Sequence, residues 1–232
     1  RPPRSTPKPS SAASDVYKRQ LFSTTQEQLD YLRFPLGEID KAETRLIAER
    51  LKLNVANKPD SQDICFVPNG DYASVIKKFR PESFKPGKIL DLQGNEIGQH
   101  EGIINYTIGQ RKGLGVGGGH GNNQEAWYVS EKDFKNNTLI ISQGSNHPSL
   151  FHKNLSADSL HWISGYPPSQ KTNLYAKIRY RQKDQECKIT NLDETSCNVQ
   201  FSVPQFAVTP GQSVVFYDGD VCLGGGIIND RS

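Results

Sequence analysis

The segment Lys58–Gly70, KPDSQDICFVPNG, divides the sequence into two patterns. Before it, apolar residues recur at helical spacing. After it, short stretches typical of strands are separated by glycine-containing turns. Within it, Cys65 lies in an apolar triplet that is followed by a Pro-Asn-Gly turn. A free cysteine usually packs in a core, whereas a nucleophilic or sulfur-carrying thiol needs exposure and a lowered pKa. The segment alone leaves both interpretations of Cys65 open.

The composition indicates a turn-rich globular protein. A chain of 232 residues suffices for one large or two small domains, and 20 glycines and 14 prolines favour short strands over a helical bundle. The formal net charge of +3 is too small to indicate nucleic acid by itself. No apolar run approaches the roughly 18 residues that span a bilayer, and no secretory signal is recognisable. We therefore expect a soluble, cytoplasmic protein that does not bind membranes.

The four cysteines, Cys65, Cys187, Cys197 and Cys222, are widely spaced. The absence of a C-x-x-C pair and of paired histidines argues against a zinc site, and a long, cysteine-poor chain argues against a disulfide scaffold. The last three lie in expected strands, so we predict that they are inert core residues.

Residues 1–20 differ in composition from the rest of the chain. Four of the first nine residues are proline and large apolar residues are nearly absent, so this segment cannot bury enough surface to fold. We expect a non-native or disordered tail and leave it out of the fold prediction. The chain contains no methionine, and we expect it to be a fragment of a longer protein.

Three helices are predicted, two before the cysteine segment and one after it. The first begins near Thr25, and the second begins at Asp40, an N-cap with Glu43 three residues later. A third covers residues 71–79, where apolar residues lie on one face and cations on the other.

Strands follow these helices. Two hairpins are predicted, one from residues 88–92 and 96–100 and one from residues 127–130 and 138–142, with a further strand over 103–107. A polar linker over 143–149 precedes four or five short, evenly spaced strands, which suggest a small antiparallel barrel. The predicted fold is therefore mixed α and β: helices within 21–70, a small β-rich domain over 71–145 and a C-terminal antiparallel β-barrel over 146–232.

Two cationic features are candidates for binding anions. Residues 107–119 hold six glycines beside Arg111 and Lys112, a composition that suits either a phosphate cradle or a solvated turn; the Walker spacing is missing. If residues 175–181 form one strand, Lys177, Arg179 and Arg181 share a face. That face is either a cationic stripe for nucleic acid, with Tyr180 available for stacking, or a solvated surface.

Five motifs resemble, in order, the bacterial tRNA-specific 2-thiouridylases (the MnmA family). The resemblance runs from Leu21 to the end of the chain and rests on the motifs SQDICFV, GQRKGLG, KIRYRQ, AVTPGQ and CLGGGII, which begin at residues 61, 109, 177, 207 and 222. It implies ATP-dependent 2-thiolation of the wobble uridine of tRNA. It also implies that residues 21–70 are the last helices and catalytic-cysteine loop of a truncated ATP-binding domain.

The resemblance also implies roles for individual residues. Cys65 matches the catalytic, persulfide-forming cysteine, which takes sulfur from a cysteine desulfurase or a sulfur-relay protein. In the family, a second cysteine then resolves the sulfur linkage by forming a disulfide. Arg179, Tyr180 and Gln212 match positions that touch tRNA. Arg111 and Lys112 belong to a segment that faces the RNA backbone, so we expect tRNA contact there as well.

Three family features do not occur in this sequence. The SGGVDSS-type pyrophosphate loop, the first catalytic cysteine and the K-D-Q-S motif are all missing. We therefore expect the ATP site to lie in a missing N-terminal domain and the chain to be inactive alone.

Two other interpretations of the sequence remain. One is a non-catalytic RNA-binding β-barrel module, and the other is a structural fragment whose cysteines are all buried. Selective alkylation of Cys65 distinguishes the sulfur carrier from both, because only an exposed thiolate reacts quickly.

Overall fold

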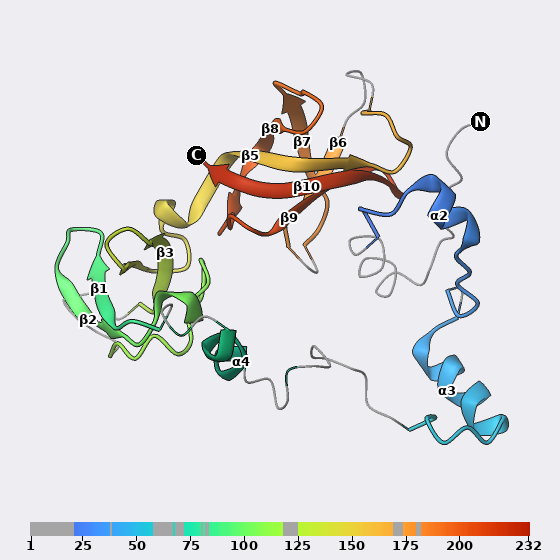
Figure 1. The fold of residues 1–232 in the computed structure, drawn as a ribbon, viewed down its shortest axis with the longest axis horizontal. Coiled ribbons are helices and arrows are strands. Elements are labelled where there is room, and N and C mark those ends of the chain that lie inside the picture. Colours follow the sequence, from blue (N-terminus) through green and yellow to red (C-terminus); the bar gives the residue numbers. More distant parts are fainter. Residues whose placement is uncertain are drawn as a thin grey trace. The chain divides into compact units, whose positions relative to one another are not determined.

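The computed structural model describes residues 21–37, 39–57, 67, 72–79, 81, 84–117, 125–168, 174–179 and 182–232. The chain divides into two compact units (Figure 1). The barrel unit comprises Arg1–Pro59, Lys153–Pro204 and Pro210–Ser232, and the sheet unit comprises Asp60–His152 and Gln205–Thr209. Among the described helices, none is long and apolar enough to cross a membrane.

The helices and strands follow each other in the order that Figure 1 shows by colour. The helices are α2 (Gln26–Tyr31), α3 (Lys41–Arg50) and α4 (Tyr72–Phe79), with 3-10 turns η3 (Ile103–Asn105) and η4 (Pro148–Leu150). The strands are β1 (Gly87–Asp91), β2 (Glu96–His100), β3 (Trp127–Asp133), β4 (Thr138–Gln143), β5 (Phe151–Trp162), β6 (Leu174–Lys177), β7 (Gln185–Thr190), β8 (Cys197–Phe206), β9 (Ser213–Asp218) and β10 (Val221–Arg231). The predicted mixed fold with a C-terminal barrel is confirmed.

The sheet unit is built on a four-stranded sheet in the order β2-β1-β4-β3. Both predicted hairpins are present, β1 with β2 and β3 with β4, and the central strands β1 and β4 run parallel. Ile89, Leu139 and Ile141 are fully buried in its core, together with Val129. The return segment 205–209 belongs to this unit, because Ala207 lies in the same core and its N–H donates to the Leu150 carbonyl.

The strand predicted over residues 103–107 is wrong. Residues 103–105 form the 3-10 turn η3, in which the N–H groups of Asn105 and Tyr106 donate to the carbonyls of Gly102 and Ile103. The backbone is satisfied locally, so no neighbouring strand is needed. The turn places Ile103 in the core beside Ile108, which explains the apolar pattern that favoured a strand.

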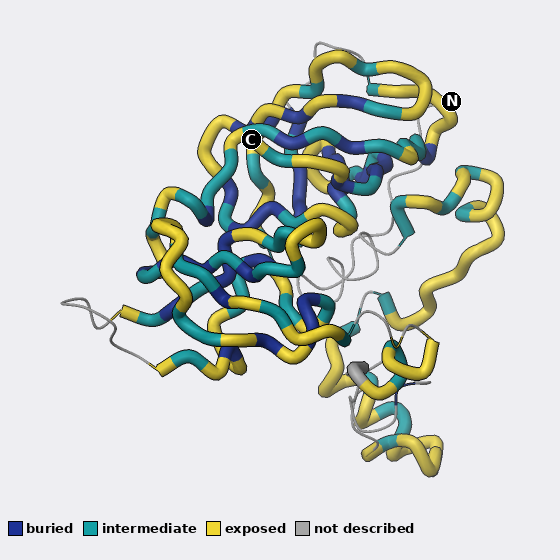
Figure 2. Tube along the Cα trace, turned by 60° about the vertical axis from the view of Figure 1, so that its left-hand side comes forward, coloured by how far each residue is buried: buried dark blue, intermediate teal, exposed yellow. Residues whose placement is uncertain are grey.

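The barrel unit contains a closed barrel of six strands in the order β10-β5-β8-β7-β6-β9. In the first part of β8, residues 197–202, buried and exposed residues alternate, as expected for a strand with one face toward the barrel interior. Figure 2 shows how buried and exposed residues are distributed along the whole described chain. Strand β5, with 12 residues the longest of the described strands, was not predicted. Its burial does not alternate regularly, so a pattern of period two is weak there.

The described N-terminal residues pack on the barrel within this unit. The Gln26 N–H donates to the Ile163 carbonyl at 3.1 Å, and His161 Nε2 lies 3.2 Å from the Thr24 carbonyl oxygen. Phe22 and Leu29 pack against a buried cluster of Ile163, Val215, Tyr217 and Cys222. The α2 segment therefore covers part of the barrel.

Side chains at the helix starts explain where α2 and α3 begin. Thr25 forms a capping box with Gln28, which was not predicted. The predicted N-cap at Asp40 is confirmed, because its carboxylate accepts a hydrogen bond from the Glu43 N–H. The apolar residues of α3 are not buried, since Leu46 is 65% exposed and none of its described residues is buried.

Candidate nucleic-acid interface

The loop that carries Arg111 and Lys112 is fixed by the side chain of Gln110. Gln110 Oε1 accepts a hydrogen bond from the Thr107 N–H at 2.9 Å, and its Nε2 donates to the Lys112 carbonyl at 2.9 Å. Backbone bonds between Gly109 and Val129 and between Val129 and Gln110 attach the same loop to β3. The loop is therefore a braced turn of the sheet unit.

Two buried residues flank the cations of this loop. Ile108 and Leu114 lie in the core of the sheet unit, whereas Arg111 and Lys112 are exposed. The backbone N–H groups at Thr107, Gly109 and Gln110 already donate within the protein. These three amides are therefore not available for a phosphate.

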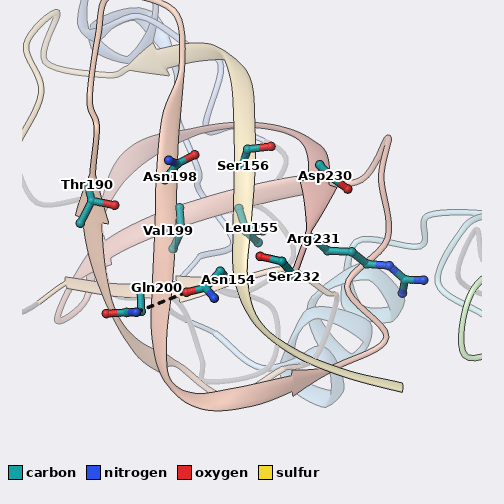
Figure 3. Close-up of a pocket in the computed structure, with 10 residues that line it drawn as sticks. All are labelled: Asn154, Leu155, Ser156, Thr190, Asn198, Val199, Gln200, Asp230, Arg231 and Ser232. Atoms are coloured by element: carbon teal, nitrogen blue, oxygen red, sulfur yellow. Dashed lines mark hydrogen bonds between the residues drawn. The ribbon is translucent and has the colours of Figure 1, made fainter. Parts of the chain in front are cut away.

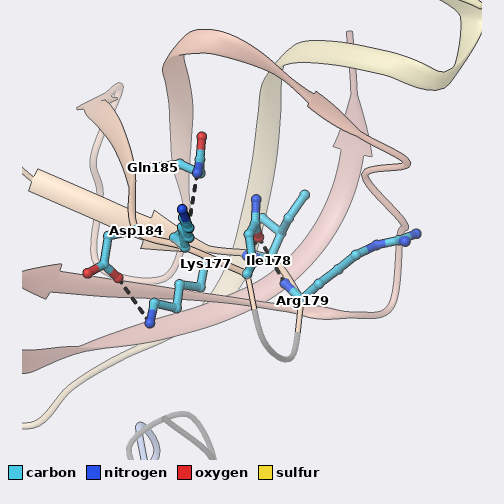
Figure 4. Close-up of polar contacts among 7 residues, drawn as sticks. Lys177, Ile178, Arg179, Asp184 and Gln185 are labelled. Carbon is cyan, nitrogen blue, oxygen red and sulfur yellow. Dashed lines mark hydrogen bonds and ion pairs between the residues drawn. The ribbon is translucent and has the colours of Figure 1, made fainter. Parts of the chain in front are cut away.

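Arg179 lies just beyond β6, in a turn that Gln182 holds. Gln182 Oε1 accepts hydrogen bonds from the N–H groups of Ile178 at 2.8 Å and of Arg179 at 3.2 Å. The Gln182 N–H donates to the Arg179 carbonyl at 3.3 Å. Figure 4 shows the Arg179 side chain extending away from the buried Lys177.

The predicted cationic stripe is wrong at Lys177. The Lys177 side chain is 9% exposed, and its Nζ lies 3.1 Å from Asp184 Oδ1 (Figure 4). The Nζ is also positioned over the Tyr217 ring. Strand β6 ends at Lys177, so the period-two alternation that would give Lys177 and Arg179 a common face does not continue. A carboxylate and an aromatic face together offset the cost of burying the ammonium.

Gln212 is exposed in the turn before β9. Hydrogen bonds from the Gly211 N–H to the Ile228 carbonyl and from the Ile228 N–H to the Gln212 carbonyl, both 2.8 Å, join this turn to β10. Because β6 and β9 are antiparallel with Lys177 opposite Val215, the chain leaves β6 and enters β9 at the same end of the pair. The barrel thus brings Arg179 and Gln212 to one end of two neighbouring strands.

Cys65 and Tyr180, as well as Arg181, lie outside the described residues. The other three cysteines are buried, as predicted. Burial raises the pKa of Cys187 to about 12 and that of Cys197 to about 12. A thiol with so high a pKa is almost entirely protonated at neutral pH and is a poor nucleophile.

The described residues near the N-terminus do not fit the phosphates of ATP. The Thr25 side chain occupies the start of α2, and the Asp40 carboxylate occupies the start of α3, where it would repel an anion. No group of metal-binding side chains occurs in the part of the chain that the structure describes. We therefore assign no cofactor to these residues.

An open groove of about 400 Å³ lies across β5, β7, β8 and β10 (Figure 3). Amides and hydroxyls dominate its lining, and Gln200 Nε2 donates to Asn154 Oδ1 at 3.3 Å. None of the predicted site residues is among its lining residues.

Sequence reasoning missed the two glutamine braces. Gln110 precedes a cation in the sequence and Gln182 follows one. No sequence pattern distinguishes a glutamine that braces a turn from one whose side chain is solvated. The only available signal is position, since each amide lies within three residues of a cation.

Three family models cover most of the chain. Residues 11–69 match the tRNA methyl transferase HUP domain, residues 73–143 the tRNA methyl transferase PRC-barrel domain and residues 152–228 the Aminomethyltransferase beta-barrel domain. A tRNA-specific 2-thiouridylase MnmA of Klebsiella pneumoniae is 46% identical over 211 residues, which is 91% of this chain. The chain belongs to the tRNA-specific 2-thiouridylase family.

Other 2-thiouridylases are similar to the same degree. The Francisella philomiragia enzyme is 47% identical over 208 residues (90% of this chain), and the Proteus mirabilis enzyme is 44% identical over 211 residues (91%). The chain spans 57% of the length of each of these three 2-thiouridylases. The HUP-domain match begins at residue 11, within the segment predicted to be a tail.

Proposed function

We propose that this chain acts in the 2-thiolation of tRNA wobble uridine and that Cys65 carries the sulfur. The observation that carries the proposal is the 46% identity to a 2-thiouridylase over 91% of the chain. The burial of Cys187, Cys197 and Cys222 supports the choice of cysteine, because none of these three thiols is accessible. Residues 1–20, 21–70, 71–145 and 146–232 remain the proposed divisions of the chain.

The sulfur-accepting step needs a donor that itself carries a persulfide, such as a cysteine desulfurase or a sulfur-relay protein. The Cys65 thiolate attacks the terminal sulfur of the donor persulfide. A new S–S bond forms at Cys65, the donor S–S bond breaks, and the donor cysteine leaves as a thiolate. One sulfur atom is transferred without an external oxidant, which leaves Cys65 as the persulfide that would deliver sulfur to the uridine.

Docking of tRNA is the second part of the proposal. Arg111 and Lys112 on the braced loop, and Arg179, Tyr180 and Gln212 on the barrel unit, are proposed contacts. Charged side chains would bind phosphate, and the tyrosine would stack on a base. The HUP-domain match supports use of ATP by the whole enzyme, but none of the described residues is assigned to it.

Mass spectrometry after incubation with a cysteine desulfurase and cysteine tests the sulfur-carrying role. We expect a mass gain of one sulfur atom, localised to Cys65, that is lost on reduction and absent from Cys65→Ser. The matched control Cys222→Ala should retain the adduct, since this buried residue is not the acceptor. An adduct on a barrel cysteine contradicts the proposal. No adduct, with tRNA binding intact, supports the non-catalytic RNA-binding alternative.

A further inference from the structure

The connection between β6 and β7 is braced at two points. At the first, Gln182 makes three hydrogen bonds to Ile178 and Arg179: its Oε1 accepts from both N–H groups and its own N–H donates to the Arg179 carbonyl. An amide oxygen has two lone pairs, and here both are used on adjacent backbone amides. This side chain therefore fixes the backbone of Arg179 from across the turn.

The second brace closes the base of the same connection. Lys177 Nζ and Asp184 Oδ1, 3.1 Å apart, join the last residue of β6 to the residue before β7. The side chains differ in exposure, 9% for Lys177 and 46% for Asp184, so the ammonium is inside and the carboxylate reaches in from the rim (Figure 4). Between the braces, Ile178 is 2% exposed and anchors the turn in the barrel.

We propose that Gln182, supported by the Lys177–Asp184 pair, is a positioning residue that holds Arg179 for contact with tRNA. The inference rests on the proposed function and adds residues that touch no RNA themselves. Lys177 has the charge of a phosphate ligand but is committed to Asp184 and the Tyr217 ring. Because the Arg179 backbone is already held before binding, tRNA binding does not lose the conformational entropy of ordering it, and the affinity is higher.

A double-mutant cycle on the 232-residue chain tests this inference. Gln182→Met keeps the side-chain length but removes the acceptor, and it should weaken tRNA binding by about tenfold, the scale of fixing one residue's backbone. In an Arg179→Ala background the same change should have almost no effect, because the residue that it positions is gone. The control Gln200→Met removes an exposed amide on β8 and should leave affinity unchanged.

Two further measurements separate positioning from other roles. Amide hydrogen exchange at Ile178 and Arg179 should accelerate in Gln182→Met, while exchange in β9 stays unchanged. In the Arg179→Ala background, the additional change Lys177→Met should leave the salt dependence of tRNA binding unchanged, because Lys177 contacts no phosphate.

Each outcome has a distinct meaning. If Arg179→Ala weakens binding and Gln182→Met is equally harmful in both backgrounds, or harmless in both, the positioning role is refuted while the proposed function stands. A decreased salt slope on loss of Lys177 refutes the supporting role of the buried pair. If Arg179→Ala binds tRNA as wild type does, the proposed contact at Arg179 fails, and this inference fails with it.

Discussion

His100 is a buried histidine at the end of β2 that the proposed function does not use. Its side chain is packed against the Tyr106 ring, and its Nε2 lies 3.2 Å from the Asn137 carbonyl oxygen. Its buried Nδ1 has no hydrogen-bond partner among the described residues. Burial lowers the pKa of His100 below its ordinary value, and the charge of Lys132 lowers it further, although the Asn137 carbonyl acts in the opposite direction. The folded sheet unit therefore holds this ring neutral.

The sheet unit should accordingly lose stability in mild acid. In the unfolded chain His100 takes up a proton near pH 6.5, whereas the folded state resists protonation until lower pH, so the unfolded state binds more protons in this window. The free energy of unfolding should fall as pH drops through that value, by at most about 1.4 kcal/mol per pH unit for one proton. Denaturant unfolding followed by hydrogen exchange in β1 and β4 measures this dependence.

The variant that tests this pH dependence is His100→Gln. It should be less stable than wild type at neutral pH but should have a flatter pH profile, because the titrating ring is gone. A slope that survives in His100→Gln would assign the acid sensitivity to another group.

Single residues also mark the limit of what the sequence predicted. The core position of Cys187 and Cys197 was predicted from their place in expected strands, and their burial confirms it. The prediction that Lys177 is exposed was wrong. Its partner Asp184 lies in the connection between β6 and β7, and Tyr217 lies far along the chain. A local pattern contains no information about partners that only the closed barrel brings together.

At the scale of elements, the closure of the barrel depends on the three glycines of β10. A Cβ atom on Gly225 would clash with the Val214 carbonyl oxygen and would lie 2.8 Å from the Phe22 ring; one on Gly226 would lie 2.7 Å from the Asp158 carbonyl oxygen. The three glycines thus allow β10 to approach its neighbours more closely than side chains would permit. At Gly225 it also admits the ring of Phe22, from a segment that the sequence placed in a different domain.

Gly225→Ala should destabilise the barrel unit by about 1–3 kcal/mol, the usual cost of overpacking a close contact. The carbonyl that the new methyl group meets belongs to a paired strand and cannot move independently. Urea unfolding measures the change. Gly117→Ala is the control, because a Cβ at that position meets no atom within 4 Å, and it should alter stability by less than about 0.5 kcal/mol. Equal stability of both variants would show that β10 and Phe22 adjust freely.

Element prediction succeeded where the signal was local. The Asp40 cap and both hairpins follow from residues within a few positions of each other. The predicted strand at 103–107 failed because apolar residues in a 3-10 turn and in a short buried strand give the same sequence pattern. Strand β5 was missed because neighbours on both sides of the barrel, and not its own alternation, determine its burial.

At the scale of the whole molecule, the sequence indicated a mixed fold ending in a barrel, and the structure confirms it. The sequence did not reveal that residues 205–209, which begin at the end of the fourth barrel strand β8, return to the sheet unit. That return depends on a hydrogen bond from Ala207 to Leu150 and on a ring contact of Phe206 with Phe151, residues that lie far earlier in the chain. The proposed tRNA contacts are consequently carried by two units, each with its own core.

This division predicts how the cations combine in tRNA binding. Each phosphate contact that is lost should decrease the slope of log affinity against log salt by about 0.7–0.9, since one counterion is no longer released. We expect a decrease of about one such step for Arg179→Ala and about two for the pair Arg111→Ala and Lys112→Ala. Because these cations lie in two units, each with its own core, we expect the combined variant to show the sum of the two decreases.

Two control variants make this expectation specific. Gln212→Ala should weaken binding without changing the slope, because an amide releases no counterion. Lys52→Gln removes an exposed cation outside the proposed contacts and should change neither quantity. Filter binding or fluorescence titration over a range of salt concentrations provides both affinity and slope. If the combined variant has the slope of Arg179→Ala alone, the braced loop does not contact RNA and docking belongs to the barrel unit; if it has the slope of the loop variant alone, the reverse holds.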